Sequence, residues 1–472
     1  MVSLERAKVT RNRTFSQYRK FVPQKKYSQI LFFAKKLKGV RITVVSSTSY
    51  GGGVAEIWHS LVPIFQSLGV NIVWYTIAAP WEFFDVTKKF HNLLQGAAGK
   101  LTEAEKKLYL KVNKKLANDL AAIPTDILLV HDPQPAVVID FLPNKPISIW
   151  RCHIDTSTTN RSAWEFLKQF IANFDHLIFT LPEYANGEIL GPAFYEAGNG
   201  NGENGHKRQS LAINKNISFF QPTIDPFDEK LTKLTKKAAW KILSRFGLAK
   251  DKPLILAPSR FDPFKDQFGV FDAFLLVLKH APQSQLLFTG PVALDDPESV
   301  RIRKKLVKKI KKTPGVELGK DVFVYTNLDG FSYLELAAAY NVASVVIQKS
   351  LAEGFGLTVA EAGFFGKTVI GGNVGGIAYQ IVDYNQDPKK ATGILVDITS
   401  PDRGILETAF WIEISLKDKK LARTLGKRAS LRVIKNFLHP QAIFNYLVLF
   451  NWLIKKEIKK FPKPQLVTYP YF

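Results

Sequence analysis

The sequence predicts an α/β protein with two doubly wound parallel sheets, each in a domain of its own. The first observation is the length of 472 residues, because one hydrophobic core rarely organises so long a chain. The second is the alternation of short apolar runs with longer amphipathic segments in both halves, which is typical of parallel strands connected by helices. The third is a break at residues 221–226 (QPTIDP), where two prolines interrupt this alternation.

Short apolar runs predict the strands. In the first half they are Arg41–Ser47, Asn71–Ile77, Asp126–Val130, Pro146–Trp150 and His176–Leu181. In the second half they are Pro253–Ala257, Gln285–Gly290, Asp321–Thr326, Ser344–Gln348, Thr368–Gly371 and Gly393–Val396. Amphipathic segments predict helices between them, including Val54–Leu68, Thr102–Ala121, Phe268–His280, Tyr333–Tyr340 and Thr358–Phe365.

These elements divide the chain into four segments. We expect a basic N-terminal arm (1–36), a first domain (37–222), a second domain (223–438) and a final helix with a tail (439–472). Residues 198–205 (GNGNGENG) predict a mobile surface loop, because such a segment cannot pack a core. Ligands of doubly wound sheets bind outside the carboxyl ends of the strands, so the loops after the strands are the candidates for the site.

The composition predicts a soluble cytoplasmic protein. Its 46% hydrophobic and 22% charged residues are ordinary for a globular chain. The single cysteine, Cys152, excludes an intramolecular disulfide and a cysteine-rich zinc site. The first thirty residues lack the apolar stretch of a signal peptide, and the most apolar tract, Ile443–Ile454, is too short to span a bilayer.

The net charge of +24 has two interpretations. A basic surface can meet nucleic acid or anionic lipid. Alternatively, the lysine runs at 301–312 and 455–463 are solvated helix faces. We favour the second, because Ile302, Leu306 and Ile310 recur every four residues and predict one core-facing side. No nucleic-acid partner is expected, and contact with anionic surfaces should be weak.

A glycine-rich loop at Gly51–Gly53 follows the first predicted strand and leads into a helix. Gly52 and Gly53 allow close approach of a phosphate or sugar to the free N–H groups of the helix start. A dinucleotide fingerprint would need a third glycine where Glu56 stands, which disfavours NAD. The alternative is a tight turn that needs glycine only for packing.

Two loops of the second half carry charged candidates. Arg260 and Lys265 follow its first strand and could converge on one diphosphate, or be ordinary surface charges. Glu353 precedes Gly354 and Gly356 in the loop of a later strand, where the N–H groups of Gly356, Leu357 and Thr358 would face a phosphate. Thr358 and Glu361 also fit a capping box, so Glu361 could instead cap the helix.

Asp132 and His153 each follow a strand of the first half. A carboxylate and an imidazole are groups that hold sugar hydroxyls. As alternatives, Asp132 could cap a helix starting at Pro133, and His153 could be a polar loop residue.

The pattern of the second half resembles a known family. Glu353 and Glu361, with seven residues between them, together with Arg260 and Lys265, resemble the donor site of the retaining glycosyltransferases of family four. The resemblance implies the GT-B fold, two Rossmann-like domains facing a central cleft. It also implies that Glu353 contacts the transferred glucose, Glu361 the nucleotide ribose, and the two cations the diphosphate. Asp266 departs from the family, where glycine is common, and places an anion near the diphosphate.

Three segments of the first half resemble a smaller group within this family. Residues 84–92 (FDVTKKFHN), 130–135 (VHDPQP) and 150–155 (WRCHID) look like the trehalose-synthesising glycosyltransferases and the related retaining trehalose phosphorylases. The likeness runs from about Leu37 to about Leu453. It implies that the first domain binds the acceptor, the second binds the donor, and the final helix packs back on the first. It places Asp132 and His153 around the two glucose rings. Further candidates are Asn327 on the donor side and, on the acceptor side, Lys88, His91, Asn92 and Asp155.

The expected reaction is retaining transfer between a nucleoside-diphosphate glucose and glucose, giving trehalose. Stabilisation of the leaving diphosphate in a dry cleft would drive it. The co-substrate is UDP- or ADP-glucose, no cofactor or metal is expected, and a homodimer is compatible with the sequence. Three alternatives stay open: a phosphorylase that uses inorganic phosphate, a lipid or polysaccharide glycosyltransferase at a membrane surface, and a nucleic-acid-binding protein. Glutamates in the candidate loops disfavour the last.

Overall fold

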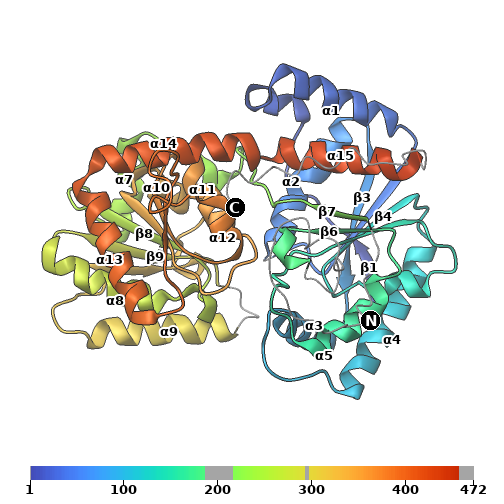
Figure 1. The fold of residues 1–472 in the computed structure, drawn as a ribbon, viewed down its shortest axis with the longest axis horizontal. Coiled ribbons are helices and arrows are strands. Elements are labelled where there is room, and N and C mark those ends of the chain that lie inside the picture. Colours follow the sequence, from blue (N-terminus) through green and yellow to red (C-terminus); the bar gives the residue numbers. More distant parts are fainter. Residues whose placement is uncertain (1, 51, 186–215, 293–296, 456–472) are drawn as a thin grey trace, which may run out of the picture. The chain divides into compact units, whose positions relative to one another are not determined.

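The computed structural model describes residues 2–50, 52–185, 216–292 and 297–455 (Figure 1). It divides into two compact units, residues 1–222 with 439–472 and residues 223–438. The predicted 198–205 loop lies outside the described residues. Among the described helices, none combines the length and the apolar character needed to cross a membrane.

The first unit is built on a seven-stranded sheet with the order β1-β3-β2-β4-β5-β6-β7. Its strands are β1 (Ser3–Arg6), β2 (Arg41–Ser46), β3 (Asn71–Ala78), β4 (Ile127–His131), β5 (Ile147–Arg151), β6 (His176–Phe179) and β7 (Asn216–Phe219). All neighbours are parallel except β1, which pairs antiparallel with β3. The loops after β2, β4 and β5 therefore leave the sheet at one edge.

Helices cover this sheet. They are α1 (Gln24–Lys36), α2 (Gly53–Ser67), α3 (Trp81–Leu94), α4 (Glu103–Ala121), α5 (Arg161–Ile171) and α15 (His439–Lys455), with 3-10 turns η1 (Phe15–Phe21), η2 (Val138–Phe141) and η3 (Pro182–Tyr184). The first 36 residues are not a separate arm, since β1 joins the sheet and Tyr18 and Ile30 are fully buried. Helix α15 packs against α1, and Asn451 donates a 2.9 Å hydrogen bond to the Phe33 carbonyl.

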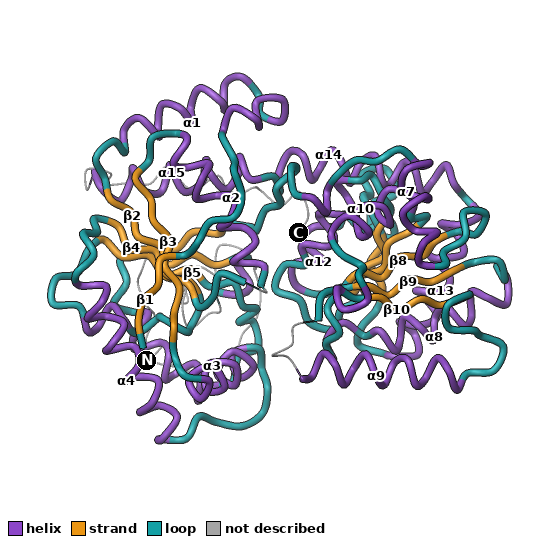
Figure 2. Tube along the Cα trace, turned by 180° about the vertical axis from the view of Figure 1, so that it is seen from behind, coloured by secondary structure: helices purple, strands orange, loops and turns teal. Residues whose placement is uncertain are grey.

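The second unit contains a six-stranded, wholly parallel sheet with the order β10-β9-β8-β11-β12-β13. Figure 2 labels β8, β9 and β10 of this sheet. Its strands are β8 (Leu254–Pro258), β9 (Gln285–Thr289), β10 (Val322–Tyr325), β11 (Val345–Gln348), β12 (Val369–Gly372) and β13 (Ile394–Val396). Its helices are α7 (Lys236–Leu243), α8 (Gln267–His280), α9 (Pro297–Lys312), α10 (Tyr333–Val342), α11 (Leu357–Phe364), α12 (Gly375–Gln380), α13 (Pro401–Lys417) and α14 (Lys419–Asn436). Short 3-10 turns complete it: η5 (Glu229–Leu231), η6 (Ser244–Phe246), η7 (Pro263–Lys265) and η8 (Asn327–Asp329).

Both faces of the second sheet are covered, which confirms the doubly wound prediction. Because side chains alternate along a strand, Ile255 belongs to the core on one face, whereas Leu254 and Leu256 belong to the core on the other. Helices α8 and α13 pack together, as do α7 and α10. Each predicted strand and helix quoted above within the described residues is present, with ends shifted by no more than two residues.

Candidate functional site

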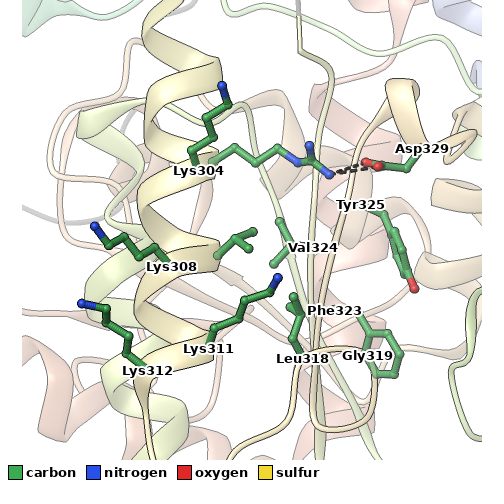
Figure 3. Close-up of a pocket in the computed structure, with 12 residues that line it drawn as sticks. Lys304, Lys308, Lys311, Lys312, Leu318, Gly319, Phe323, Val324, Tyr325 and Asp329 are labelled. Carbon is green, nitrogen blue, oxygen red and sulfur yellow. Dashed lines mark hydrogen bonds and ion pairs between the residues drawn. The ribbon is translucent and has the colours of Figure 1, made fainter.

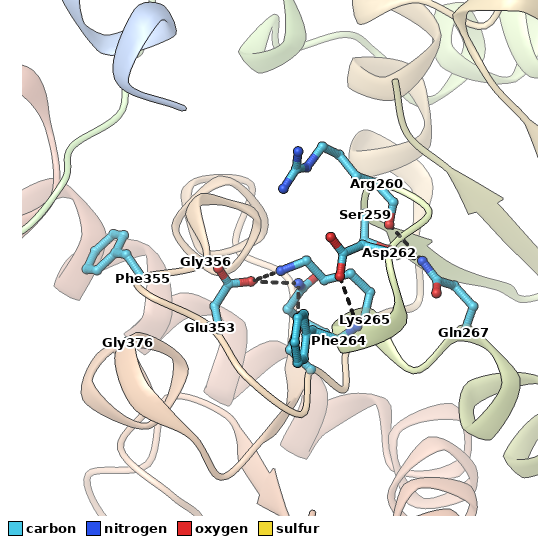
Figure 4. Close-up of polar contacts among 12 residues, drawn as sticks. Ser259, Arg260, Asp262, Phe264, Lys265, Gln267, Glu353, Phe355, Gly356 and Gly376 are labelled. Carbon is cyan, nitrogen blue, oxygen red and sulfur yellow. Dashed lines mark hydrogen bonds and ion pairs between the residues drawn. The ribbon is translucent and has the colours of Figure 1, made fainter. Parts of the chain in front are cut away.

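The loops after β8 and β11 meet through a cation and a carboxylate. Lys265 Nζ lies 2.5 Å from Glu353 Oε2, and both side chains are mostly buried. The backbone joins the same loops, because Leu351 N–H donates to the Phe264 carbonyl at 2.8 Å. Figure 4 shows Lys265 and Glu353 pointing toward one another. The structure thus brings together two residues that are 88 positions apart in the sequence.

Arg260 lies in the same β8 loop, and its side chain is exposed. Its carbonyl accepts a 2.7 Å hydrogen bond from Gln267 Nε2, whereas Figure 4 draws its guanidinium without a dashed contact, and no hydrogen bond or ion pair joins that guanidinium to another described residue. An uncommitted guanidinium at the carboxyl end of a strand can make a bidentate contact with an anion.

Asp266, the departure from the family pattern, has a structural explanation. Its backbone is left-handed, with φ +47°, a conformation that glycine adopts freely and aspartate tolerates. Its Oδ1 accepts the Gly269 N–H at 3.1 Å and so caps α8, while Oδ2 pairs with Lys349 Nζ. The Lys349 side chain is only 1% exposed. The anion that we expected near the diphosphate is therefore paired with a lysine that the sequence analysis did not single out.

The loop Glu353–Gly356 is fixed by a second glycine-rich segment. Gly376 N–H donates to the Glu353 carbonyl at 3.2 Å, and a Cβ on Gly376 would lie 2.2 Å from the Phe355 Cα. Gln380 Nε2 donates to the carbonyls of Phe355 and Gly356. Glycine at position 376 is needed here for close backbone approach.

Helix α11 starts at Leu357, with Gly356 as N-cap at φ +80°. The alternative of a Thr358–Glu361 capping box is wrong, because the N-cap has no side chain and Glu361 lies in the second turn. The N–H groups of Leu357 and Thr358, in the first turn, have no acceptor within the helix.

Glu361 is buried instead, with 4% exposure. Its Oε1 lies 2.6 Å from Lys230 Nζ, and its Oε2 accepts the Tyr340 hydroxyl at 2.9 Å. Lys230 comes from η5, more than a hundred residues earlier in the chain, and no local sequence pattern indicates this pairing. Both oxygens of the proposed ribose-binding carboxylate are thus already oriented by the protein.

Asn327, in η8, holds a neighbouring loop. Its Oδ1 accepts the Val292 N–H at 2.8 Å, and its Nδ2 donates to the Val292 carbonyl at 3.2 Å. These bonds occupy both ends of the amide, so the residue fixes the loop after β9.

In the first unit, the loops after β4 and β5 bring Asp132 and His153 together. The His153 N–H donates to Asp132 Oδ1 at 2.7 Å. Asp132 has a left-handed backbone, with φ +61°, and its carbonyl accepts Trp150 Nε1 at 2.9 Å. No helix starts at Pro133, so the capping alternative for Asp132 is wrong; its carboxylate binds the neighbouring loop instead.

The electrostatics of this pair are set by burial. Desolvation raises the pKa of Asp132 to about 7, although the His153 N–H and the Arg151 cation oppose the shift. Desolvation, followed by the charge of Arg151, holds the pKa values of His131 and His153 well below the usual range. Arg151 is itself 1% exposed and donates to the Phe179 carbonyl at 2.8 Å. Both imidazoles are therefore neutral at neutral pH.

The other sequence candidates of this unit lie on three different segments of the chain. Lys88, His91 and Asn92 lie on α3, where Lys88 is exposed. Asp155 Oδ1 accepts the Ser157 N–H and hydroxyl, at 3.0 and 2.6 Å. Gly52 is the N-cap of α2 and Gly53 its first residue, and a Cβ on Gly52 would meet open space. The tight-packing alternative therefore does not explain Gly52.

A groove of about 720 Å³ lies elsewhere in the second unit, between α9 and the edge strand β10 (Figure 3). The predicted site residues do not line it. Its floor includes Leu318, Phe323 and Val324, and its cations are Arg303, Lys304, Lys308, Lys311 and Lys312. Figure 3 shows Lys311 extending toward β10, and Arg303 is paired with Asp329 at 2.7 Å. Leu306 and Ile310 are fully buried, which confirms the predicted core-facing side of this helix.

Comparison with known proteins identifies the class. Residues 44–186 match the model of the trehalose synthase N-terminal domain, and residues 239–432 match that of the glycosyl transferases group 1. A solved trehalose-6-phosphate synthase is similar in fold, with a TM-score of 0.66 at 14% identity over 87% of this chain and 98% of its own. Sucrose-phosphate synthase from Thermosynechococcus elongatus gives 0.60 at 19% identity, over 88% and 100%. The fold and the group 1 match define a glycosyltransferase of the GT-B type, as the resemblance implied.

Closer relatives specify the family. The trehalose synthase of Pyrococcus horikoshii is 40% identical over 442 residues, covering 93% of this chain and 97% of its own. That of Rubrobacter xylanophilus is 35% identical over 448 residues, covering 94% and 98%. The chain belongs to the trehalose synthase family, and its chemistry is trehalose-related glycosyl transfer. A trehalose phosphorylase of Pleurotus pulmonarius is 26% identical over 403 residues, which are 77% of this chain but 52% of that protein.

Proposed function

We propose that the protein transfers glucose, with retention, between a nucleoside diphosphate and a second glucose, forming or cleaving trehalose. The bond from glucose C1 to the leaving phosphate oxygen breaks, and a bond from C1 to the acceptor hydroxyl oxygen forms on the same face. The hydroxyl proton passes to the leaving diphosphate. The observation that carries the proposal is the convergence of Lys265 and Glu353 at the carboxyl ends of β8 and β11.

The donor would bind in the second unit. Lys265 and the uncommitted Arg260 supply positive charge for the diphosphate, and the free N–H groups at the start of α11 add to it. Glu353, beside Lys265, would contact the glucose hydroxyls. Glu361 would accept the ribose hydroxyls through its remaining lone pairs, held in place by Lys230 and Tyr340. This supports UDP- or ADP-glucose as co-substrate, with the two cations providing the charge stabilisation without a metal.

The acceptor would bind in the first unit. Asp132 and His153 would hold sugar hydroxyls, and the partly buried position of His153 suits this role. Gly52 and Gly53 would allow a sugar or phosphate to approach the start of α2. Lys88, His91, Asn92 and Asp155 are proposed to extend this acceptor side.

A phosphorylase is the second candidate, supported by the similarity to trehalose phosphorylase. The deciding experiment incubates the protein with UDP-glucose or ADP-glucose plus glucose, and separately with trehalose plus UDP, ADP or inorganic phosphate. We expect trehalose from at least one sugar nucleotide, and no consumption of trehalose with phosphate alone. Consumption only when phosphate is present would overturn the synthase proposal. Glu353→Gln is the inactive control, because it keeps the side-chain volume and removes the charge.

A further inference from the structure

His131, which the reaction as proposed does not use, contacts His153 directly. His131 ends β4 and is 1% exposed. Its Nδ1 lies 2.9 Å from His153 Nε2, with the ring planes 26° apart. A separation of 2.9 Å is that of a hydrogen bond, so one imidazole must donate and the other accept.

The rest of the His131 ring decides which one donates. Its Nε2 is buried and has no hydrogen-bond partner among the described residues, while Trp58 packs against the ring with centroids 5.3 Å apart. If His131 carried its proton on Nε2, a buried N–H donor would lack an acceptor. If the proton is on Nδ1, only a lone pair is left without a donor. Orphaned buried N–H groups are the rarer and costlier of the two.

We propose that His131 is a positioning residue that donates from Nδ1 and thereby fixes His153 as the Nδ1–H tautomer. His153 Nε2 is then occupied as an acceptor. The other nitrogen, Nδ1, has no hydrogen-bond partner among the described residues, and the His153 side chain is partly exposed. His153 therefore presents a fixed hydrogen-bond donor, and not a proton acceptor, to an oxygen atom of its ligand.

The surroundings keep this arrangement neutral. The buried cation Arg151 is the charged group that acts on both imidazoles, and Asp132 binds the His153 backbone N–H. A second proton on either ring would be placed near Arg151. The identity of the ligand as a sugar rests on the proposed function, whereas the tautomer rests on geometry alone.

The test is an NMR measurement on the full chain labelled with ¹⁵N-histidine. Two-bond ¹H–¹⁵N correlations at neutral pH report which ring nitrogen carries the proton, and His153→Asn assigns the signals. We expect His153 in the Nδ1–H form, against the Nε2–H preference of free histidine. In His131→Phe, which keeps an aromatic ring, His153 should lose this form. His131→Asn should retain it, because its amide can still donate. A wild-type His153 in the Nε2–H form would overturn the proposal, even if the variants do not fold.

Kinetics separate this inference from the proposed function. His131→Phe should lower kcat/KM for trehalose about tenfold, the scale of one neutral hydrogen bond, with His131→Asn recovering most of it. If His153 shows the expected tautomer but wild type does not act on trehalose, the proposed function fails and the positioning role stands. Equal kcat/KM in wild type and His131→Phe would overturn the positioning role in catalysis.

Discussion

Lys265 Nζ lies 2.5 Å from Glu353 Oε2, so a cation of the β8 loop and a carboxylate of the β11 loop form an ion pair at the end of the second sheet. The pair links the group proposed to bind the diphosphate to the group proposed to contact the transferred sugar. In this arrangement, movement of either loop would misplace both.

Arg260→Ala and Lys265→Ala should each lower turnover by roughly two orders of magnitude, as removal of a key electrostatic stabiliser does. Steady-state rates with sugar nucleotide and glucose measure this. Arg260→Ala should leave the free energy of unfolding unchanged, because the side chain is exposed. Arg423→Ala, another exposed arginine of the second unit, is the matched control and should keep full turnover. Near-normal rates in both site variants would contradict the diphosphate assignment.

Asp266→Gly should destabilise the protein even though glycine suits the left-handed backbone. The substitution leaves the nearly buried Lys349 without its carboxylate, and breaking such a pair costs about 3–5 kcal/mol. Denaturant unfolding measures the loss. In the double variant Asp266→Gly/Lys349→Met, most of the stability should return, since no buried charge remains. Equal losses in the single and double variants would argue against the pairing.

Glu361→Gln should weaken binding of UDP or ADP by roughly 1–3 kcal/mol, the scale of hydrogen bonds to a charged group. Isothermal titration calorimetry measures it. Glutamine is preferred to alanine, because its amide oxygen can still accept a hydrogen bond from Lys230 Nζ and it keeps the side-chain volume.

Thr358→Ala is the control for Glu361→Gln. Thr358 does not cap α11, so this variant should lose little stability. If Glu361→Gln binds nucleotide as wild type does, the ribose role is wrong. If wild type binds neither nucleotide and consumes trehalose only with phosphate, the protein is a phosphorylase and the synthase proposal is wrong.

Asp132→Asn should remove the part of the pH dependence of the free energy of unfolding that comes from this carboxyl group. Because burial raises the pKa of Asp132 to about 7, the folded protein holds this proton more tightly than the unfolded chain, whose pKa is about 3.9. The contribution of Asp132 to the free energy of unfolding is fully present at low pH. It is lost as the pH rises from about 4 to about 7, by at most roughly 4 kcal/mol.

Thermal unfolding at pH 5 and pH 8 tests this dependence. Wild type should lose stability between the two pH values relative to Asp132→Asn, and the variant should have lower turnover. Asp155→Asn, in the next loop, is the control and should follow wild type. Parallel pH profiles for wild type and Asp132→Asn would show that the buried carboxyl is not protonated as expected.

The basic groove between α9 and β10 should bind anionic surfaces weakly. Exposed charges are screened at physiological ionic strength, where the Debye length is about 8 Å. We expect co-sedimentation with anionic vesicles, or binding to duplex DNA, to vanish near 0.15 M salt. Such a strong salt dependence is typical of contacts between exposed charges. Lys308→Glu/Lys311→Glu should abolish the residual low-salt binding and leave turnover unchanged. Tight vesicle binding that resists salt would favour glycosylation at a membrane surface.

The strands and the loops after them could be predicted because they follow from local patterns. Buried parallel strands are short apolar runs, and glycines mark the turns that follow, so Arg260, Lys265, Glu353, Asp132 and His153 could all be placed at strand ends. Strands β1 and β7 were not predicted from these patterns. The four residues of β1, SLER, carry little apolar signal, and β7 follows a long segment without periodicity.

The partners of the site residues were decided by tertiary structure. Lys349 pairs with Asp266 across 83 positions, and Lys230 reaches Glu361 from a turn far earlier in the chain. Lys349 directly follows a predicted strand and His131 lies within a quoted motif, so the strand-end rule could have drawn attention to both. Lys230 had no such sign. A hydrogen bond or ion pair depends on which side chains the folded chain brings within about 3 Å, and a local pattern carries no information on distances between segments remote in sequence.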